Sequence, residues 1–444
     1  MNDPGLVVTE VSTARRSLGS SYRKLFAATA ISNIGDGVSS VAYPWLASAV
    51  TRSPLLVALI AVAQRLPWLV FTLPAGVITD RVDRRKAMVL MDGLRFLLTL
   101  VVAVAVLGQQ KHLPGPKAVQ TVVGTRTGLY LVVLTATLLL GTAEVLRDNS
   151  GQTMLPAVVA SDDLEKANGR LWSAESVANT FVGPPLGSLL LLGAFAIPFF
   201  VDAASFFAAA ALVAAIPGNF RAERPEDHVA SPWRQELKEG FGWLWRHELL
   251  RPMAIILGFM NLAGMVGGAT MVLFVQEVMK GGPFLFSIIG FGGALGAVVG
   301  GAVASATSKR LGSGTCLAIA LGVPVVLSTV IGLVPIWPVV VVAFGLETLV
   351  GTLWNVITVS LRQTIIPSHL LGRVNSVYRF FAWGMMPIGA AIGGLVVAIG
   401  GHLTTRNWAL RSVWFVYGAI YLVLFLVGRS KLTTEKLEQA RAAA

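Results

Sequence analysis

Three charged side chains stand near the middle of long apolar stretches. Asp36 and Glu347 are carboxylates that can exchange a proton or hold a cation, while Arg65 keeps its positive charge. A charge near mid-membrane costs roughly 2.5 to 3.5 kcal/mol on insertion scales unless it finds a partner. We therefore expect Asp36 to pair with Arg65 on the adjacent helix. The pair is either structural or part of a proton-coupling or cation-coupling site that also includes Glu347.

Aromatic and polar residues accompany Glu347 in the last third of the chain. Trp354 and Asn355 follow it by two helical turns, and Phe380 and Trp383 lie in the next apolar stretch. An acid with aromatics on facing helices suits a cavity for large amphiphilic, often cationic molecules. The same aromatics could equally face lipid or pack within a helix bundle.

Other chemistries lack their sequence signatures. No Gly-x-x-x-x-Gly-Lys-Ser/Thr segment is present to hold ATP phosphates, so any pumping must use an ion gradient. The five His are scattered and Cys316 is the only Cys, which leaves no metal-ligand spacing. No nucleophile stands beside a base. We therefore expect no enzyme activity, no cofactor and no metal.

The composition indicates an all-α polytopic membrane protein. Hydrophobic residues make up 55% of the chain and charged residues only 13%, against about 25% charged in soluble domains. A spanning helix needs about 20 apolar residues. Twelve such spans are predicted, near residues 25–50, 54–78, 87–108, 128–148, 168–192, 196–216, 250–275, 284–306, 314–334, 337–361, 375–399 and 409–428.

The net charge of +12 is a topology signal rather than a nucleic-acid footprint. Most Lys and Arg residues fall in alternate connections, starting with the segment before the first span, so both termini are expected in the cytoplasm of a cell whose inner membrane the chain crosses. Residues 1–24 are polar, and the apolar run that follows is too long for a cleaved signal peptide. The first span is expected to remain in the protein.

A burst of charge ends the second span. Gly76 is followed by Asp80 and Arg81, and then by Arg84, Arg85 and Lys86, which cannot enter hydrocarbon cheaply. The segment is therefore a turn between two spanning helices. The spacing of Gly76, Asp80, Arg84 and Arg85 recurs, without the acid, at Gly301, Ser305, Lys309 and Arg310, which predicts two parallel repeats of six helices.

This turn resembles the signature of the major facilitator superfamily, Gly-x-x-x-Asp-Arg-x-Gly-Arg-Arg/Lys. Asp83 stands where Gly is usual, as in the drug-efflux and enterobactin-exporter-like branch. The resemblance implies a cytoplasmic latch in which Asp80 holds the two six-helix halves together. It also implies that the end of the fourth span meets this turn in a charge cluster.

The fifth span resembles the superfamily's antiporter motif, which is typical of exporters. Gly183, Pro184 and Gly187 match it, whereas Asn179 and Ser188 depart from it. Gly183 and Gly187 also form a small-x-x-x-small face on which helices pack closely. As packing alone the stretch would be unremarkable.

Five segments are expected along the chain. They are an N-terminal tail (1–24), a first six-helix bundle (25–216), a cytoplasmic linker with an amphipathic helix (217–249), a second six-helix bundle (250–428) and a cytoplasmic tail (429–444).

The resulting hypothesis is a secondary active exporter that works by alternating access. It would exchange protons for a hydrophobic or amphiphilic small molecule such as a drug or siderophore, as a monomer in the lipid bilayer, with no nucleic-acid partner. An importer of the same fold and a non-transporting lipid-handling or scaffold protein are the alternatives. The antiporter-like stretch argues against the first, and the charges within the spans argue against the second.

The topology can be tested by thiol labelling. With Cys316 replaced, a cysteine at Lys111 should react with a membrane-impermeant reagent on intact cells, whereas a cysteine at Arg84 should not, because the charged turn is cytoplasmic. Labelling at position 84 would reverse the assignment.

Overall fold

The protein consists of helices that run along one long axis. The computed structural model describes residues 18–79, 81–116, 118–221 and 233–443. The first half holds α1 (Gly19–Val50), α2 (Pro54–Thr79), α3 (Arg84–Gln109), α4 (Thr127–Val158), α5 (Leu164–Ser176), the π-helix η4 (Val177–Val182), α6 (Gly183–Gly193) and α7 (Ala196–Ala214). Short 3-10 turns are η1 (Gln110–His112), η2 (Val119–Thr121) and η3 (Ser161–Asp163).

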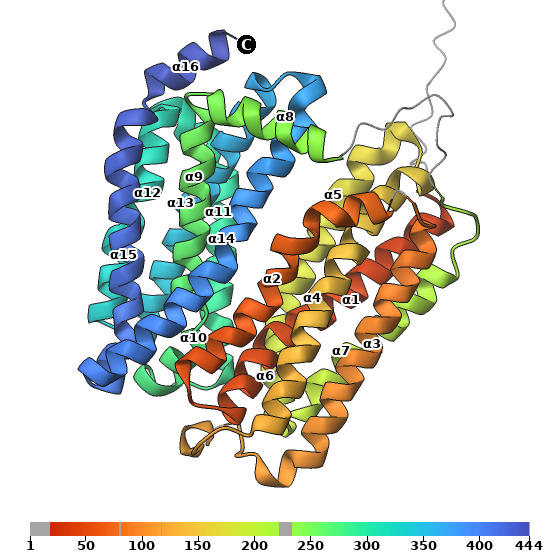
Figure 1. The fold of residues 1–444 in the computed structure, drawn as a ribbon, viewed down its shortest axis with the longest axis vertical. Helices are drawn as coiled ribbons and strands as arrows, with labels where there is room; N and C mark the ends of the chain where they lie inside the picture. The colour runs from red at the N-terminus through yellow and green to blue at the C-terminus, as the bar shows by residue number, and fades with distance from the viewer. Residues whose placement is uncertain (1–17, 80, 117, 222–232, 444) are drawn as a thin grey trace, which may run out of the picture.

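The second half follows a linker helix, α8 (Trp233–Arg246). It holds α9 (Leu250–Gly268), α10 (Met271–Leu273), the π-helix η5 (Phe274–Val278), α11 (Pro283–Leu311), α12 (Ser313–Leu333), α13 (Trp337–Ile365), α14 (Ser368–Leu403), α15 (Arg406–Lys431) and α16 (Thr434–Ala442). Figure 1 shows the two halves side by side, close at the end with α10 and apart toward the end with α8.

Eleven helical segments in the described residues are long and apolar enough to cross a membrane. The predicted span that is missing from these eleven is the first one, residues 25–50, which corresponds to α1. This helix is 32 residues long, but its Ser, Asn and Asp residues lower its mean hydropathy. One predicted boundary was wrong, because α4 continues to Val158 rather than ending near residue 148. The fifth predicted span is confirmed as one candidate span, Ser161–Gly193, within which α5, η4 and α6 follow one another.

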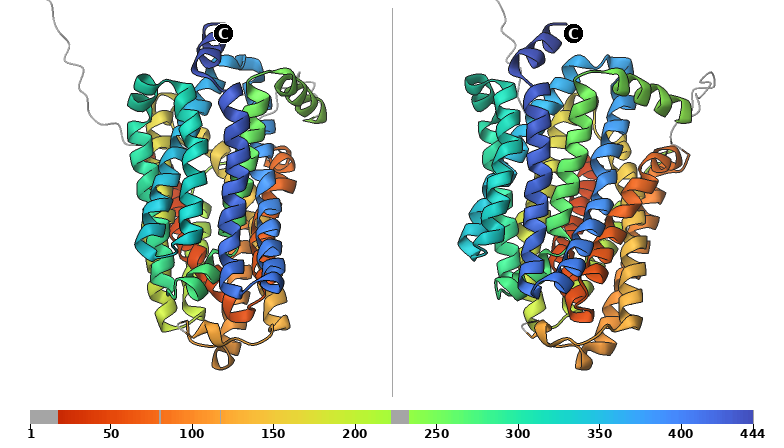
Figure 2. Two further views of the ribbon diagram at one scale, coloured as in Figure 1. Left: turned by 90° about the vertical axis from the view of Figure 1, so that its left-hand side faces the viewer. Right: turned by 60° about the vertical axis from the view of Figure 1, so that its left-hand side comes forward.

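Linker helix α8 lies across the end of the bundle rather than along it (Figure 2). Leu244 is buried against the second half, Phe241 stacks near Phe381 of α14, and Glu239 forms an ion pair with Arg373 of α14. Gly240 lies so close to the Arg373 backbone that an added Cβ would come within 2.8 Å of it. The linker is thus packed on the second half.

Polar contacts cross between the halves at the opposite end. Glu277 binds Arg52 of the first half and Arg406 of the second, whose Nε lies 2.9 Å from Oε2. The amide of Gln276 donates to Ser48 (2.8 Å) and accepts from Arg52 (2.6 Å). Here Ser188 of α6 also meets Ser287 of α11 at 2.6 Å between hydroxyl oxygens. We call Arg52, Gln276, Glu277 and Arg406 the end seal.

The end seal predicts a labelling experiment. In a background with Cys316 replaced, a cysteine at Ser188 is buried and should react slowly with a small thiol reagent. Adding Glu277→Gln removes the charge shared by two arginines, so the halves should separate more often and labelling should accelerate several-fold. Lys280→Gln, which removes a charge from the same loop, is the control. Equal labelling in both variants would contradict the role of Glu277.

Candidate functional site

A polar cavity of about 500 Å³ lies within the first half. On α1 its lining residues Thr29, Asn33, Asp36, Ser40 and Tyr43 recur every three or four positions, which places them on one helical face. The other walls come from α2, α3, α4, α5, η4 and α7. The cavity extends as far as Leu25 and Asn168, toward the end at which α1 begins and α8 lies (Figure 1).

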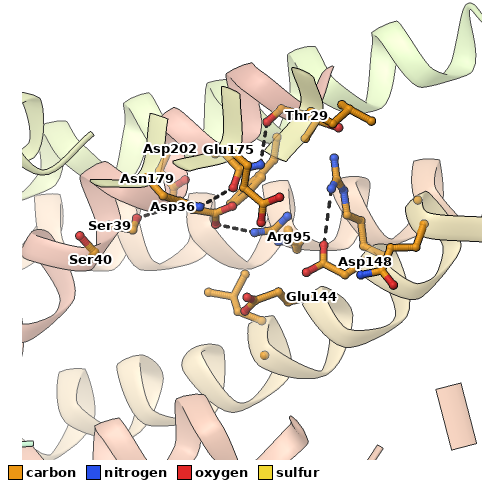
Figure 3. A pocket seen from close by; sticks show the side chains of 18 of the residues that line it. Thr29, Asp36, Ser39, Ser40, Arg95, Glu144, Asp148, Glu175, Asn179 and Asp202 are labelled. Carbon is orange, nitrogen blue, oxygen red and sulfur yellow. Dashed lines mark hydrogen bonds and ion pairs between the residues drawn. The ribbon is translucent and has the colours of Figure 1, made fainter. Parts of the chain in front are cut away.

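A chain of alternating charges runs along the cavity wall. Arg95 of α3 binds Asp36 of α1 at 2.5 Å and Asp92 at 3.5 Å. Asp92 also lies 3.5 Å from Arg147 of α4, which lies 3.5 Å from Asp148. Figure 3 shows Asp36 and Arg95 pointing toward each other, with Glu144 and Asp148 nearby. Three helices are thereby joined by one ion-pair chain.

Burial makes these pairs mutually dependent. Asp92 has no exposed surface, and Arg95 is only 3% exposed, with its guanidinium 3.9 Å from the centre of the Phe206 ring. Removing one partner from a buried pair leaves an uncompensated charge, which costs about 3 to 5 kcal/mol. Arg95 is therefore the residue on which the ion-pair chain depends.

The predicted pairing of Asp36 with Arg65 was wrong. Arg65 lines the same cavity from α2, but Arg95 takes the Asp36 carboxylate. Asp92 and Arg95, three residues apart on α3, pair as buried members of this longer chain. Three-residue spacing on one helix predicted their contact, and no feature of the sequence indicated that Asp36 would join them.

Three further carboxylates face the cavity outside the ion-pair chain. Glu144, Glu175 and Asp202 line it, and in the described part of the protein none of them forms an ion pair. Ser39 donates a hydrogen bond to Asp202 Oδ2 at 2.5 Å, while the other oxygen has no described hydrogen-bond partner. With Asp36 and Asp148, five carboxylates therefore line the cavity together with the three guanidinium groups of Arg65, Arg95 and Arg147, and Asp92 pairs with Arg95 without lining it. Figure 3 shows Glu175 and Asp202 beside Asp36.

The antiporter-like stretch packs directly on α1. A Cβ added to Gly183 would lie 2.5 Å from Gly37 Cα, and one added to Gly187 would lie 2.6 Å from the Val38 carbonyl oxygen. Pro184 accepts a hydrogen bond from Ser287 of the second half at its carbonyl (2.9 Å). Only glycine allows this closeness of two backbones. The stretch thus packs on α1 at Gly37 and Val38, outside the face that lines the cavity, and also contacts the second half.

Glu347 occupies a separate place in the second half. It lies on α13, its Oε1 is buried without a described hydrogen-bond partner, and the Tyr417 side chain of α15 is close enough to interact with it. The rings of Tyr417 and Tyr421 stack beside it at 4.8 Å. The structure therefore does not bring Glu347 together with Asp36 and Arg65.

The four predicted cavity residues of the second half are dispersed. Trp354 is buried, whereas Asn355 and Phe380 are exposed, and the ring of Trp383 packs at a tilt against Trp68 of α2, with 4.6 Å between the ring centres. None of them lines the cavity of the first half. Trp383 is instead part of the contact between the halves.

The charged turn can be described on one side only. Asp80 lies outside the described residues, and Gly76 is described only as part of the helical backbone of α2. Arg84 donates to the Thr153 carbonyl of α4 (3.1 Å), Arg85 donates to the Ile216 carbonyl after α7 (2.6 Å), and Arg81 is exposed. The turn is therefore tied to α4 and to the segment that follows α7, both in its own half.

Asp83, the residue that departs from the superfamily signature, has a structural role. Its carboxylate accepts the Lys86 N–H as the N-cap of α3 (2.9 Å) and the Phe220 N–H (3.1 Å). Partial burial opposes its charge, but these donors and the nearby Arg85 and Lys86 hold the pKa of Asp83 below its usual range. The sequence carried a signal for this cap, because Asp is a favoured N-cap residue and Asp83 stands shortly before the third predicted span.

Comparison with known proteins identifies the family. The family described as "transmembrane secretion effector" matches residues 18–433. The chain belongs to this family of major facilitator superfamily transporters. It is a multi-pass membrane transporter rather than an enzyme, and the predicted resemblance is confirmed.

Individual relatives match nearly the whole chain. The multidrug efflux pump Tap of Mycolicibacterium fortuitum is 30% identical over 415 residues, which are 90% of this chain and 94% of Tap. The enterobactin exporter EntS of Shigella boydii is 26% identical over 387 residues, 84% of this chain and 85% of EntS. A bacterial homologue of the iron transporter ferroportin, solved in an inward-facing state, has a TM-score of 0.71 at 15% identity, covering 94% of this chain and all of that one. The last likeness shows the fold.

The ion-pair chain predicts unequal effects for two arginines of this transporter. Arg95→Gln should lower the free energy of unfolding in detergent by about 3 to 5 kcal/mol, because Asp36 and Asp92 lose their shared cation. Arg65→Gln, the matched control on the cavity wall, should cost less than about 1 kcal/mol. Equal losses in thermal or denaturant unfolding would show that Arg65 also neutralises Asp36.

Proposed function

We propose that this transporter is a secondary active exporter that expels an amphiphilic, positively charged small molecule in exchange for protons. Its relatives include proteins named as a multidrug efflux pump and an enterobactin exporter, so a drug or a siderophore is the expected kind of substrate. The sequence contains no phosphate-binding loop, which leaves an ion gradient as the energy source.

The observation that carries the proposal is the surplus of carboxylates in the cavity. Glu144, Glu175 and Asp202 are outside the ion-pair chain, and Asp36 and Asp148 share their guanidinium partners with Asp92. Carboxylates close together in a partly enclosed site cannot all remain ionised without compensation. Protons or a cationic substrate can supply that compensation, so binding of one disfavours binding of the other. Such competition is the basis of antiport.

Alternating access is supported by the difference between the two ends. The end seal joins the halves at one end, while the cavity extends toward the other. We infer that export requires the end seal to separate and the halves to close at the end with α8. The turn from Gly76 to Arg85, with Asp80, is the proposed latch for the closed state. Both termini, by the distribution of Lys and Arg, are cytoplasmic in this proposal.

Glu347 is the proposed proton carrier of the second half. In contrast to Asp36 it forms no ion pair with an arginine, and its buried Oε1 has no hydrogen-bond partner among the described residues. A carboxylate in that setting is neutral when protonated and costly when ionised, so a conformational change that alters its access to water transfers a proton. Asp36, bound to Arg95, is instead suited to an ion pair that rearranges when substrate binds.

The competing functions differ in direction or in transport itself. An importer of the same fold would carry substrate into the cell, either down the substrate's own gradient or together with protons. A lipid-handling or scaffold protein would show no gradient-driven flux. The carboxylate surplus in an open cavity favours transport over a scaffold role, because such groups have a cost that packing alone does not require.

Vesicles with an imposed pH gradient test the coupling. Purified wild-type protein should accumulate a lipophilic fluorescent cation against its gradient, whereas Glu347→Gln should abolish accumulation and retain downhill equilibration, because the variant cannot release a proton. Glu435→Gln, on exposed helix α16, is the control. Accumulation of wild-type size by Glu347→Gln would exclude Glu347 as the coupling residue. Absence of gradient-driven flux in the wild type would contradict the proposed function.

A further inference from the structure

A second cavity lies outside the transport cavity, at the beginning of α3. It measures about 650 Å³ and shares no lining residue with the first one. Its walls come from the end of α2, the first turns of α3, the middle of α4 and the segment that follows α7. The apolar part of the lining is formed by Ile78, Val82, Leu90, Met91 and Leu146.

The rim of this cavity is basic. Arg81, Lys86 and Arg221 line it and are exposed, so their charged groups are available to a ligand. Arg85 also lines it while donating to the Ile216 carbonyl. Asp83, the one acid in the lining, has both oxygens engaged by backbone N–H groups. Even with Asp80 counted from the sequence, Arg81, Arg84, Arg85, Lys86 and Arg221 leave a surplus of positive charge.

The apolar lining continues along the outer face of α3. Leu90 is 66% exposed, and Leu94, Leu97, Val101 and Val104 follow it at alternating spacings of four and three residues, all exposed. These spacings place them in one stripe down the helix. In a transmembrane helix such a stripe faces hydrocarbon, so the basic rim stands at the membrane surface directly above a lipid-facing track.

We propose that this cavity binds an anionic phospholipid. Lys86, Arg81 and Arg221 hold the headgroup phosphate, and an acyl chain lies against Leu90 and the α3 stripe. Guanidinium and ammonium groups are suited to phosphate oxygens, and basic pockets between transmembrane helices recognise anionic headgroups. A free anion would leave the apolar wall unused. The bound lipid bridges the α2–α3 turn, α4 and the segment after α7.

Binding of phosphatidylglycerol to the full chain in detergent tests this site. Fluorescent phosphatidylglycerol should bind the wild type, with phosphatidylcholine as the zwitterionic comparison. Lys86→Gln with Arg221→Gln should weaken phosphatidylglycerol binding roughly 25-fold, since each of the two basic residues near an anionic lipid surface contributes about fivefold. Lys309→Gln with Arg310→Gln removes two exposed charges from the corresponding turn of the second half and should leave binding unchanged.

Two further arms keep the proposal open to refutation. Leu90→Trp adds bulk to the exposed apolar wall and should weaken phosphatidylglycerol binding even if the charge variant does not fold. Millimolar inorganic phosphate should not displace the lipid, because phosphate lacks the acyl contacts. The assignment would be overturned by unchanged binding in the Lys86 and Arg221 variant, by displacement of the lipid by phosphate, or by equal binding of phosphatidylcholine. It would also be overturned if the protein formed a dimer that covers the cavity. The transport assay is independent of these outcomes.

Discussion

The burial of Arg95 is the constraint on which the first half depends. Its guanidinium binds Asp36 of α1 and Asp92 of its own helix while Phe206 of α7 covers one face. Removing a guanidinium from water is costly, and the cost is offset only where carboxylates and ring surface surround it closely. The positions of α1, α3 and α7 around the cavity are therefore coupled through a single side chain. Arg147 extends the same coupling to α4.

Small residues let the polar wall form. Gly35 lies so near α7 that an added Cβ would reach within 2.5 Å of Asp202 Oδ1, and Gly37 stands in similar proximity to Gly183. The π-helical turn η4 lies beside these contacts, and its Asn179 donates a hydrogen bond to Asn33 of α1. Single-turn π-helices occur often at functional sites. Here the turn directs an amide toward the cavity between two helices that are otherwise joined by glycine packing.

Charge is arranged differently at three levels of the molecule. The end seal uses two arginines around Glu277, so each charge there has a partner. The transport cavity carries more carboxylates than guanidinium groups, which suits exchange of protons and cations. The lipid-site rim carries more cations than carboxylates, which suits phosphate. Paired charges hold the halves together, whereas unpaired charges of each sign mark where a ligand of the opposite sign is expected.

Local properties of the chain were enough to identify the class of protein. Apolar stretches, the charged turn and the spacing of Gly183 and Gly187 depend on a few neighbouring residues, and they predicted membrane helices and the superfamily. The partner of Asp36 could not be obtained in this way. It depends on how α1, α2 and α3 are rotated about their axes and how closely glycines let them approach, and these are properties of the assembled bundle. Arg65 and Arg95 both fall within predicted spans, but only the packing of α3 against α1 and α7 brings Arg95 to the carboxylate.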